Sequence, residues 1–194
     1  MENRWIQAAT ILPPTITVCG RRLLPFCLRH RVALEAIGSP VIQTEKPVGA
    51  DDILAAVRIL SSHDLTELRK PTTLAEGWRL SRMKVSKKAL LSEAAKLHYY
   101  FAAQSLWPRF WQKENNAGDS GTPWPLVVVA SLMRNGCSYD QAWTMPEAEA
   151  IWLHVAHTQA AGADVQVVSD IEWEAMEKYN REQAEKSKTQ NSRN

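Results

Sequence analysis

The sequence predicts a mainly α-helical protein: a compact multi-helix domain with a small N-terminal β-hairpin and a disordered C-terminal tail. Three observations support this fold class. Apolar residues recur at helical spacing along most of the chain, Ser/Thr-x-x-Glu/Gln motifs mark several helix starts, and residues 180–194 contain no large apolar side chain. We therefore expect an N-terminal extension with the hairpin over 1–24, a helical domain over 25–179, and a disordered polar tail over 180–194.

The hairpin is predicted from alternating, β-branched residues at 15–18, a turn at Gly20-Arg21 and a second strand over 22–24. Residues 25–37 then form a short helix in this prediction. Gly38 can end that helix because glycine adopts the left-handed conformation that a helix C-terminus often requires.

Three further helices are expected before the middle of the chain. Asp51-Asp52 places acidic side chains at a helix start, and Thr73 with Glu76 has the spacing of a capping box. The longest helix is expected after Ser86. Pro108 should end or kink this helix, because its ring clashes with the preceding turn, and a polar loop over 114–122 follows.

The apolar run at 124–133 is compatible with a buried strand or a buried helix. Its length, the proline at position 123 and the stop signal Asn135-Gly136 favour the helix.

Two helix starts follow one another within residues 138–162. Ser138 with Gln141 and Thr144 with Glu147 both match the capping-box pattern, and an apolar stripe that includes Trp152 follows. Beyond this region, residues 165–167 are expected to form a short strand. Ser169 with Glu172 should cap a last helix that ends at about Tyr179.

Composition favours a protein of the cytoplasm without a membrane segment. The three cysteines are odd in number and irregularly spaced, so no disulfide framework is expected. Glu2, Arg4 and Pro13-Pro14 make the N-terminus a poor signal peptide. The uncharged run at 120–133 is too short to span a bilayer.

Charge is unevenly distributed along the chain. Residues 1–113 hold 17 Lys and Arg against 9 Asp and Glu, a balance of +8, whereas residues 114–194 hold 6 against 12, a balance of −6. This asymmetry is compatible with head-to-tail self-association, with intramolecular docking, with an acidic partner for the first half, or with an ordinary solvated surface.

Candidate catalytic and metal-binding patterns are incomplete. His154 and His157 lie one helical turn apart with Glu147 two turns below, but no third ligand follows nearby. Cys27-x-x-His30, with Cys19 upstream, lacks a fourth ligand at finger-like spacing. Residues 118–121 have the letters Gly-Asp-Ser-Gly, but they belong to a polar loop and not to a protease fold. We therefore expect no enzyme activity, no metal and no cofactor.

A basic segment over 79–88 is the best indication of nucleic-acid binding. Several cations beside Trp78 could contact phosphates while the ring stacks on a base, although the same residues also suit a solvated surface. The cations are Arg79, Arg82, Lys84, Lys87 and Lys88.

Three separated stretches resemble tail assembly chaperones of tailed phages and prophages. The first is Leu24-Pro25-Phe26-Cys27-Leu28-Arg29-His30 with Leu34-Glu35-Ala36-Ile37-Gly38-Ser39-Pro40, and the second is Asp52-Ile53-Leu54-Ala55-Ala56-Val57. The third is Gly136-Cys137-Ser138-Tyr139-Asp140-Gln141-Ala142-Trp143-Thr144-Met145-Pro146 with Ala148, Ala150 and Gly162. The resemblance departs at Cys27-Leu28-Arg29-His30, where related proteins often have Ser-x-Gly-His.

This resemblance implies a mainly helical, non-enzymatic protein of the bacterial host cytoplasm. Such a protein binds the long, aggregation-prone tape measure protein, delivers it to tail tube subunits and does not become part of the mature virion. Binding of a helical client needs exposed apolar and aromatic surface, and the chain has eight Trp against three Phe and four Tyr. The candidates for this surface, each of which also suits the core, are Trp107, Trp111, Trp143 and Trp152.

Overall fold

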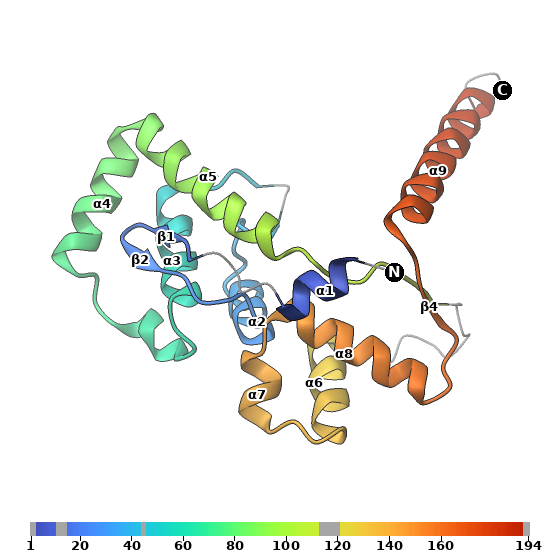
Figure 1. Ribbon diagram of the computed structural model, residues 1–194. Coiled ribbons are helices and arrows are strands. Elements are labelled where there is room, and N and C mark those ends of the chain that lie inside the picture. The colour runs from blue at the N-terminus through green and yellow to red at the C-terminus, as the bar shows by residue number, and fades with distance from the viewer. Residues whose placement is uncertain (1–2, 11–14, 44–45, 113–120, 192–194) are drawn as a thin grey trace.

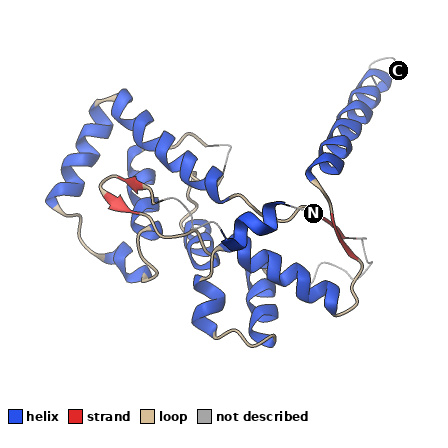
Figure 2. Cartoon of the chain, viewed as in Figure 1, coloured by secondary structure: helices blue, strands red, loops and turns tan. Residues whose placement is uncertain are grey.

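The computed structural model describes residues 3–10, 15–43, 46–112 and 121–191, and this part is mainly helical, with an antiparallel two-stranded hairpin near the N-terminus (Figures 1 and 2). The predicted mainly helical fold class and its N-terminal hairpin are therefore confirmed. The helices are α1 (Asn3–Thr10), α2 (Leu28–Ala36), α3 (Ala50–Leu60), the short 3-10 helix η1 (Leu65–Arg69), α4 (Leu74–Val85), α5 (Lys87–Gln104), α6 (Trp124–Arg134), α7 (Tyr139–Thr144), α8 (Glu147–Ala160) and α9 (Asp170–Asn191). The strands are β1 (Thr17–Val18), β2 (Arg21–Arg22), β3 (Phe110–Gln112) and β4 (Val165–Val167).

The hairpin turns one residue earlier than the sequence predicts. β1 and β2 are antiparallel, with Thr17 opposite Arg22, and Cys19 and Gly20 form the turn with φ of 49° and 71°. Two positive φ values are typical of a type I′ turn, whose twist matches that of the strands. Because Val18 and Leu23 are buried in the main core, the hairpin packs as part of the helical body.

Two apolar clusters form the core, and α2 belongs to both. The first cluster joins the hairpin to α3, α4 and α5, and it includes Ala33 and Leu34 of α2. The second joins α6, α7 and α8, and it includes Leu28 at the start of α2. In Figure 1, α2 lies between these two groups of helices. Helix α2 therefore joins the two apolar clusters.

The run at 124–133 is a helix, as its flanking residues predict. Val128, Val129 and Leu132 of α6 are buried, whereas Leu126 and Val127 are exposed. This spacing buries one helical face and leaves the other to solvent.

Of the two successive capping boxes that the sequence predicts, only the first forms. The Gln141 N–H donates to Ser138 Oγ at 3.3 Å, and the Ser138 N–H donates to Gln141 Oε1 at 3.1 Å. The second prediction is wrong, because Thr144 still belongs to α7 and its hydroxyl donates to the Asp140 carbonyl at 2.7 Å. Glu147 instead turns its carboxylate into the protein, towards α2.

Two elements, α1 and β3, were not predicted from local sequence patterns, and both contact parts of the chain that are distant in the sequence. The expected strand at 165–167 is confirmed as β4, and it pairs antiparallel with β3. Helix α1 packs on α8, where the Trp5 and Trp152 rings lie 6.4 Å apart, edge to face. Neither α1 nor β3 has a strong pattern of its own.

Helix α9 extends further than the sequence predicts. Its capping box forms at Ser169 and Glu172, but the helix continues past Tyr179 to Asn191, whereas a disordered tail from 180 was expected. The segment is rich in Glu, Gln, Lys and Ala, which favour a helix without any packing, and Arg181 pairs with Glu177 one turn before it. Figure 1 shows α9 projecting away from the other helices. Among the described helices, none is long and apolar enough to cross a membrane.

Candidate functional site

A buried ion pair at the junction of the two clusters is the centre of the candidate site. The Arg31 guanidinium of α2 donates from Nη2 to Glu147 Oε2 at 2.9 Å and from Nε to Glu147 Oε1. Glu147 is 1% exposed, and its backbone N–H donates to the Phe26 carbonyl at 2.7 Å. The start of α8 is therefore attached to the start of α2 through both backbone and side chain.

The charge state of Arg31 follows from these contacts. Burial disfavours the guanidinium cation, but the hydrogen bonds and the negative charge of Glu147 outweigh this effect and raise the pKa of Arg31. Glu35, one turn further along α2, adds a carboxylate at 3.7 Å. Arg31 is thus a permanent, internally compensated cation.

Three aromatic rings surround the Arg31 cation. Its Cζ atom lies 5.1 Å from the centre of the Trp107 ring, 5.3 Å from that of Phe26 and 5.3 Å from that of Trp124. A cation at this distance attracts the electron-rich faces of the rings. Phe26 is buried, but Trp107 is 37% and Trp124 43% exposed. The ion pair therefore holds two indole rings in place at the surface.

A pocket opens beside Trp107. Its volume is about 180 Å³, and its lining comes from the start of α2, the loop after α2 and the C-terminal end of α5. The polar end of Gln104 is already used, because it accepts from the Phe26 N–H at 2.7 Å and donates to the Tyr100 carbonyl at 3.2 Å. The lining residues are Phe26, Arg31, Val41, Ile42, Phe101, Gln104, Ser105 and Trp107. What remains for a ligand is mainly apolar surface.

Of the four tryptophans predicted to bind a client, the structure places Trp107 in this pocket. Trp143 and Trp152 are core residues, 9% and 8% exposed, and the Trp152 indole donates to the Leu106 carbonyl at 2.9 Å. Trp111 lies in β3, with its side chain outside the described part. Trp124 was missed, because it begins an apolar run that the sequence assigns to the core.

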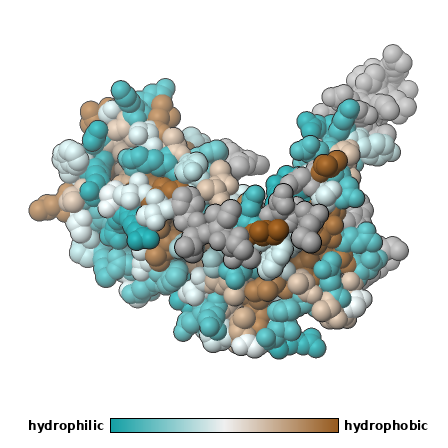
Figure 3. Space-filling model, viewed as in Figure 1, coloured by the Kyte–Doolittle hydropathy of each residue, from teal (hydrophilic) through white to brown (hydrophobic). Residues whose placement is uncertain are grey.

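Other exposed apolar side chains lie apart from this pocket. Figure 3 shows hydrophobic residues between hydrophilic ones on the face that carries α1 and α8. Trp5 and Ile6 of α1 are each 43% exposed.

The basic segment over 79–88 lies on α4 and the start of α5. Trp78 is 64% exposed, and the Arg82 guanidinium lies 5.7 Å from its ring centre. Part of the positive charge is already balanced, since Lys84 pairs with Asp51 at 2.9 Å and Glu93 lies with Arg79 in the wall of a pocket of about 140 Å³.

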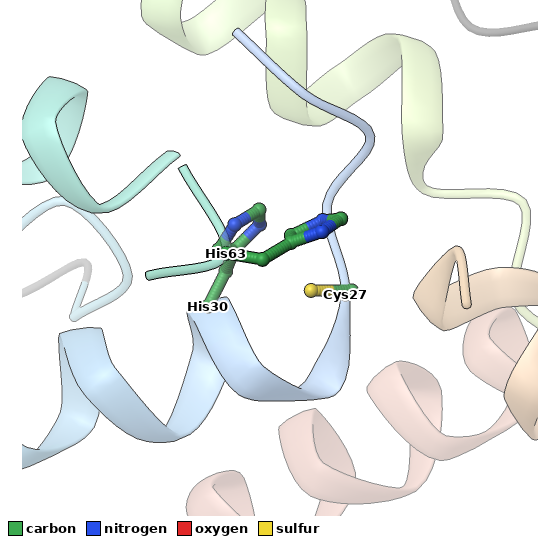
Figure 4. A group of neighbouring side chains, drawn as sticks. All are labelled: Cys27, His30 and His63. Carbon is green, nitrogen blue, oxygen red and sulfur yellow. The ribbon is translucent and has the colours of Figure 1, made fainter. Parts of the chain in front are cut away.

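The structure completes one of the two metal patterns that the sequence left open. His63, in the loop after α3, joins Cys27 and His30 at the start of α2 (Figure 4). Within the described residues, this is the one group of three such side chains whose potential ligand atoms lie within 4.8 Å of one another. His154 and His157 gain no such third ligand, because Glu147 binds Arg31 instead.

Comparisons of the chain with protein-family models, with curated proteins and with solved structures find no match. The functional conclusion therefore depends on the geometry above and on the resemblance of the three sequence stretches. Fixed aromatic side chains lie beside an apolar pocket, and this arrangement is suited to binding an apolar ligand.

Proposed function

We propose that this protein is a non-enzymatic tail assembly chaperone of a tailed phage, which binds the tape measure protein in the bacterial host cytoplasm. The three resembling stretches support the class of protein. The observation that carries the binding activity is the pocket beside Trp107, with Trp107 and Trp124 fixed by Arg31.

The proposed client is an amphipathic helix of the tape measure protein. A helix can bury its apolar face in a groove by inserting large side chains at i, i+3, i+4 and i+7. Val41, Ile42 and Phe101 offer apolar contacts of this kind, and Trp107 forms one wall. Because Glu147 and Glu35 neutralise Arg31, the cation can hold the rings without repelling a basic client.

Trp107 should dominate the binding energy. A rigid, half-exposed tryptophan at the centre of an interface commonly contributes about 2 kcal/mol or more, because it buries a large apolar area with little loss of side-chain freedom.

Co-expression with the tape measure protein tests this proposal. The wild-type chain should increase the soluble fraction of that protein and co-purify with it, and Trp107→Ala should reduce both effects. Trp78→Ala is the matched control, because Trp78 is also an exposed tryptophan but lies on α4. No increase in solubility and no complex with the wild-type chain would exclude the chaperone function.

A second candidate function is nucleic-acid binding by the basic segment over 79–88. It is favoured by the exposed Trp78 ring with the Arg82 guanidinium above it. Binding to DNA or RNA that persists at physiological salt, and that is lost in Arg82→Glu/Lys87→Glu, would support this alternative. The absence of any binding at low salt would remove it.

A further inference from the structure

We infer that Cys27, His30 and His63 form a binding site for a single Zn²⁺ ion, with water as the fourth ligand. A thiolate and two imidazoles are ligands that Zn²⁺ prefers, and three protein ligands with an open fourth position are a common zinc arrangement. The site goes beyond the proposed chaperone function and does not depend on it.

The close approach of three donor side chains, one thiol and two imidazoles, is the main reason for this assignment. His30 is fully buried, and its Nε2 is hydrogen-bonded to the Ser62 carbonyl at 3.1 Å, whereas its Nδ1 has no partner of good hydrogen-bond geometry, although the Pro25 carbonyl lies near the ring. His63 Nε2 is also buried without a partner. Buried polar atoms almost always have a partner, so these unpartnered nitrogens are available to bind a metal. The Nδ1 atoms of His154 and His157 are also unpartnered, but among the described residues no third ligand lies close to them. The bond from His30 Nε2 to a carbonyl also fixes the tautomer that leaves Nδ1 free for a metal.

The geometry requires a small closure around the ion. The three candidate ligand atoms lie within 4.8 Å of one another. Around tetrahedral zinc, with bonds of about 2.0–2.3 Å, ligand atoms are about 3.3–3.6 Å apart. His63 is half-buried and follows the end of α3, so its side chain can make the movement of at most about 1 Å that this closure requires.

The charges around the site permit a bound cation. Burial raises the pKa of the Cys27 thiol to about 11, so binding of Zn²⁺ must release the thiol proton to solvent as the sulfur becomes a thiolate. Arg29 is the neighbouring cation, and it pairs with Asp140 at 3.0 Å. His30 and His63 are held neutral by their buried positions, which is the state that binds a metal.

The experiment uses the untagged full chain, freed of metal with a chelator. Zn²⁺ binding is measured by competition with a chromophoric chelator, and Co²⁺ is added in parallel because a thiolate ligand gives a sulfur-to-metal charge-transfer band. The wild-type chain should bind one Zn²⁺ per molecule, show that band and unfold at a higher temperature with Zn²⁺ than without it.

Three variants assign the ligands. His63→Ala, a change at a half-buried loop position, should weaken Zn²⁺ binding by about a hundredfold or more, and Cys27→Ala should abolish the Co²⁺ charge-transfer band. His154→Ala/His157→Ala is the control, because it removes the other histidine pair and should retain binding. The site is overturned if the wild-type chain binds no Zn²⁺ at micromolar concentration, if His63→Ala binds as tightly as wild type, or if the control variant loses the metal.

Discussion

Two buried glutamates, Glu76 and Glu147, connect helices that are far apart in the sequence. Glu76 accepts hydrogen bonds from Arg58 at 2.8 Å and from the Thr73 backbone at 2.9 Å, and it pairs with Arg21 at 3.0 Å. Glu147 likewise accepts hydrogen bonds from Arg31, as described above. Such pairs need not add net stability compared with apolar residues, but breaking one leaves a buried charge alone.

Glu147→Gln should lower the free energy of unfolding by about 3–5 kcal/mol, because Arg31 stays buried without its carboxylate. Denaturant unfolding measures the loss. Glu149→Gln, two residues further along α8 and only half-buried, is the control. A loss no larger than that of the control would contradict the role given to the pair.

Acid should weaken the fold through Glu76. Hydrogen bonds from Arg58 lower the pKa of Glu76 to about 2 from 4.5. Between these values the unfolded chain binds the proton more readily than the folded one, so this contribution is present above pH 4.5 and is lost as the pH falls towards 2.

The size of this effect is at most about 3 kcal/mol. Urea unfolding from neutral to acidic pH should show the loss, and Glu76→Gln should be less stable at neutral pH and less sensitive to acid. An unchanged pH dependence in Glu76→Gln would show that other groups cause the acid sensitivity.

At the scale of elements, two motifs of the same capping-box pattern form different structures. Ser138 with Gln141 forms the capping box of α7, whereas Thr144 with Glu147 does not form one. Ser138→Ala should therefore destabilise the protein by about 1 kcal/mol, and Thr144→Ala by clearly less, because its hydroxyl only donates back to an exposed helix carbonyl. Equal losses in thermal unfolding would contradict this difference.

Helices with local signals could be predicted from the sequence, and elements set by distant contacts could not. The caps at Thr73, Ser86 and Ser138 mark real helix starts, since a cap acts within a single turn. β3 exists because β4 pairs with it across about a third of the chain, and no spacing near position 110 shows this. Likewise, α9 continues past Tyr179, the last large apolar residue of the sequence, so apolar spacing could not predict its end.

The candidate sites, too, could be predicted only where they depend on residues close together in the sequence. The sequence proposed Trp107, and the aromatic composition made an exposed tryptophan plausible. The pocket also needs Phe26 from the segment before α2, Arg31 from α2 and Phe101 from α5. Cys27 and His30 were recognised as neighbours. His63 was not, because it approaches them only after α3 has packed on α2.

At the scale of the whole molecule, α2 should make the two apolar clusters unfold together. Leu28 lies in one cluster and Leu34 in the other, and Arg31 between them binds Glu147 of α8. We expect one unfolding transition, with the same midpoint by tryptophan fluorescence, to which the buried Trp143 and Trp152 contribute, and by far-UV circular dichroism. Two separated midpoints would show that the clusters are independent.

The central claim is that a client binds in the pocket beside Trp107, and cross-linking from that position tests it most directly. A photoreactive phenylalanine analogue is placed at position 107 or, as the control, at position 78, in cells that also produce the tape measure protein. Position 107 should form a covalent adduct with the tape measure protein, and position 78 should not. Adducts from position 78 alone, or from neither position although the two proteins co-purify, would contradict the pocket as the binding site.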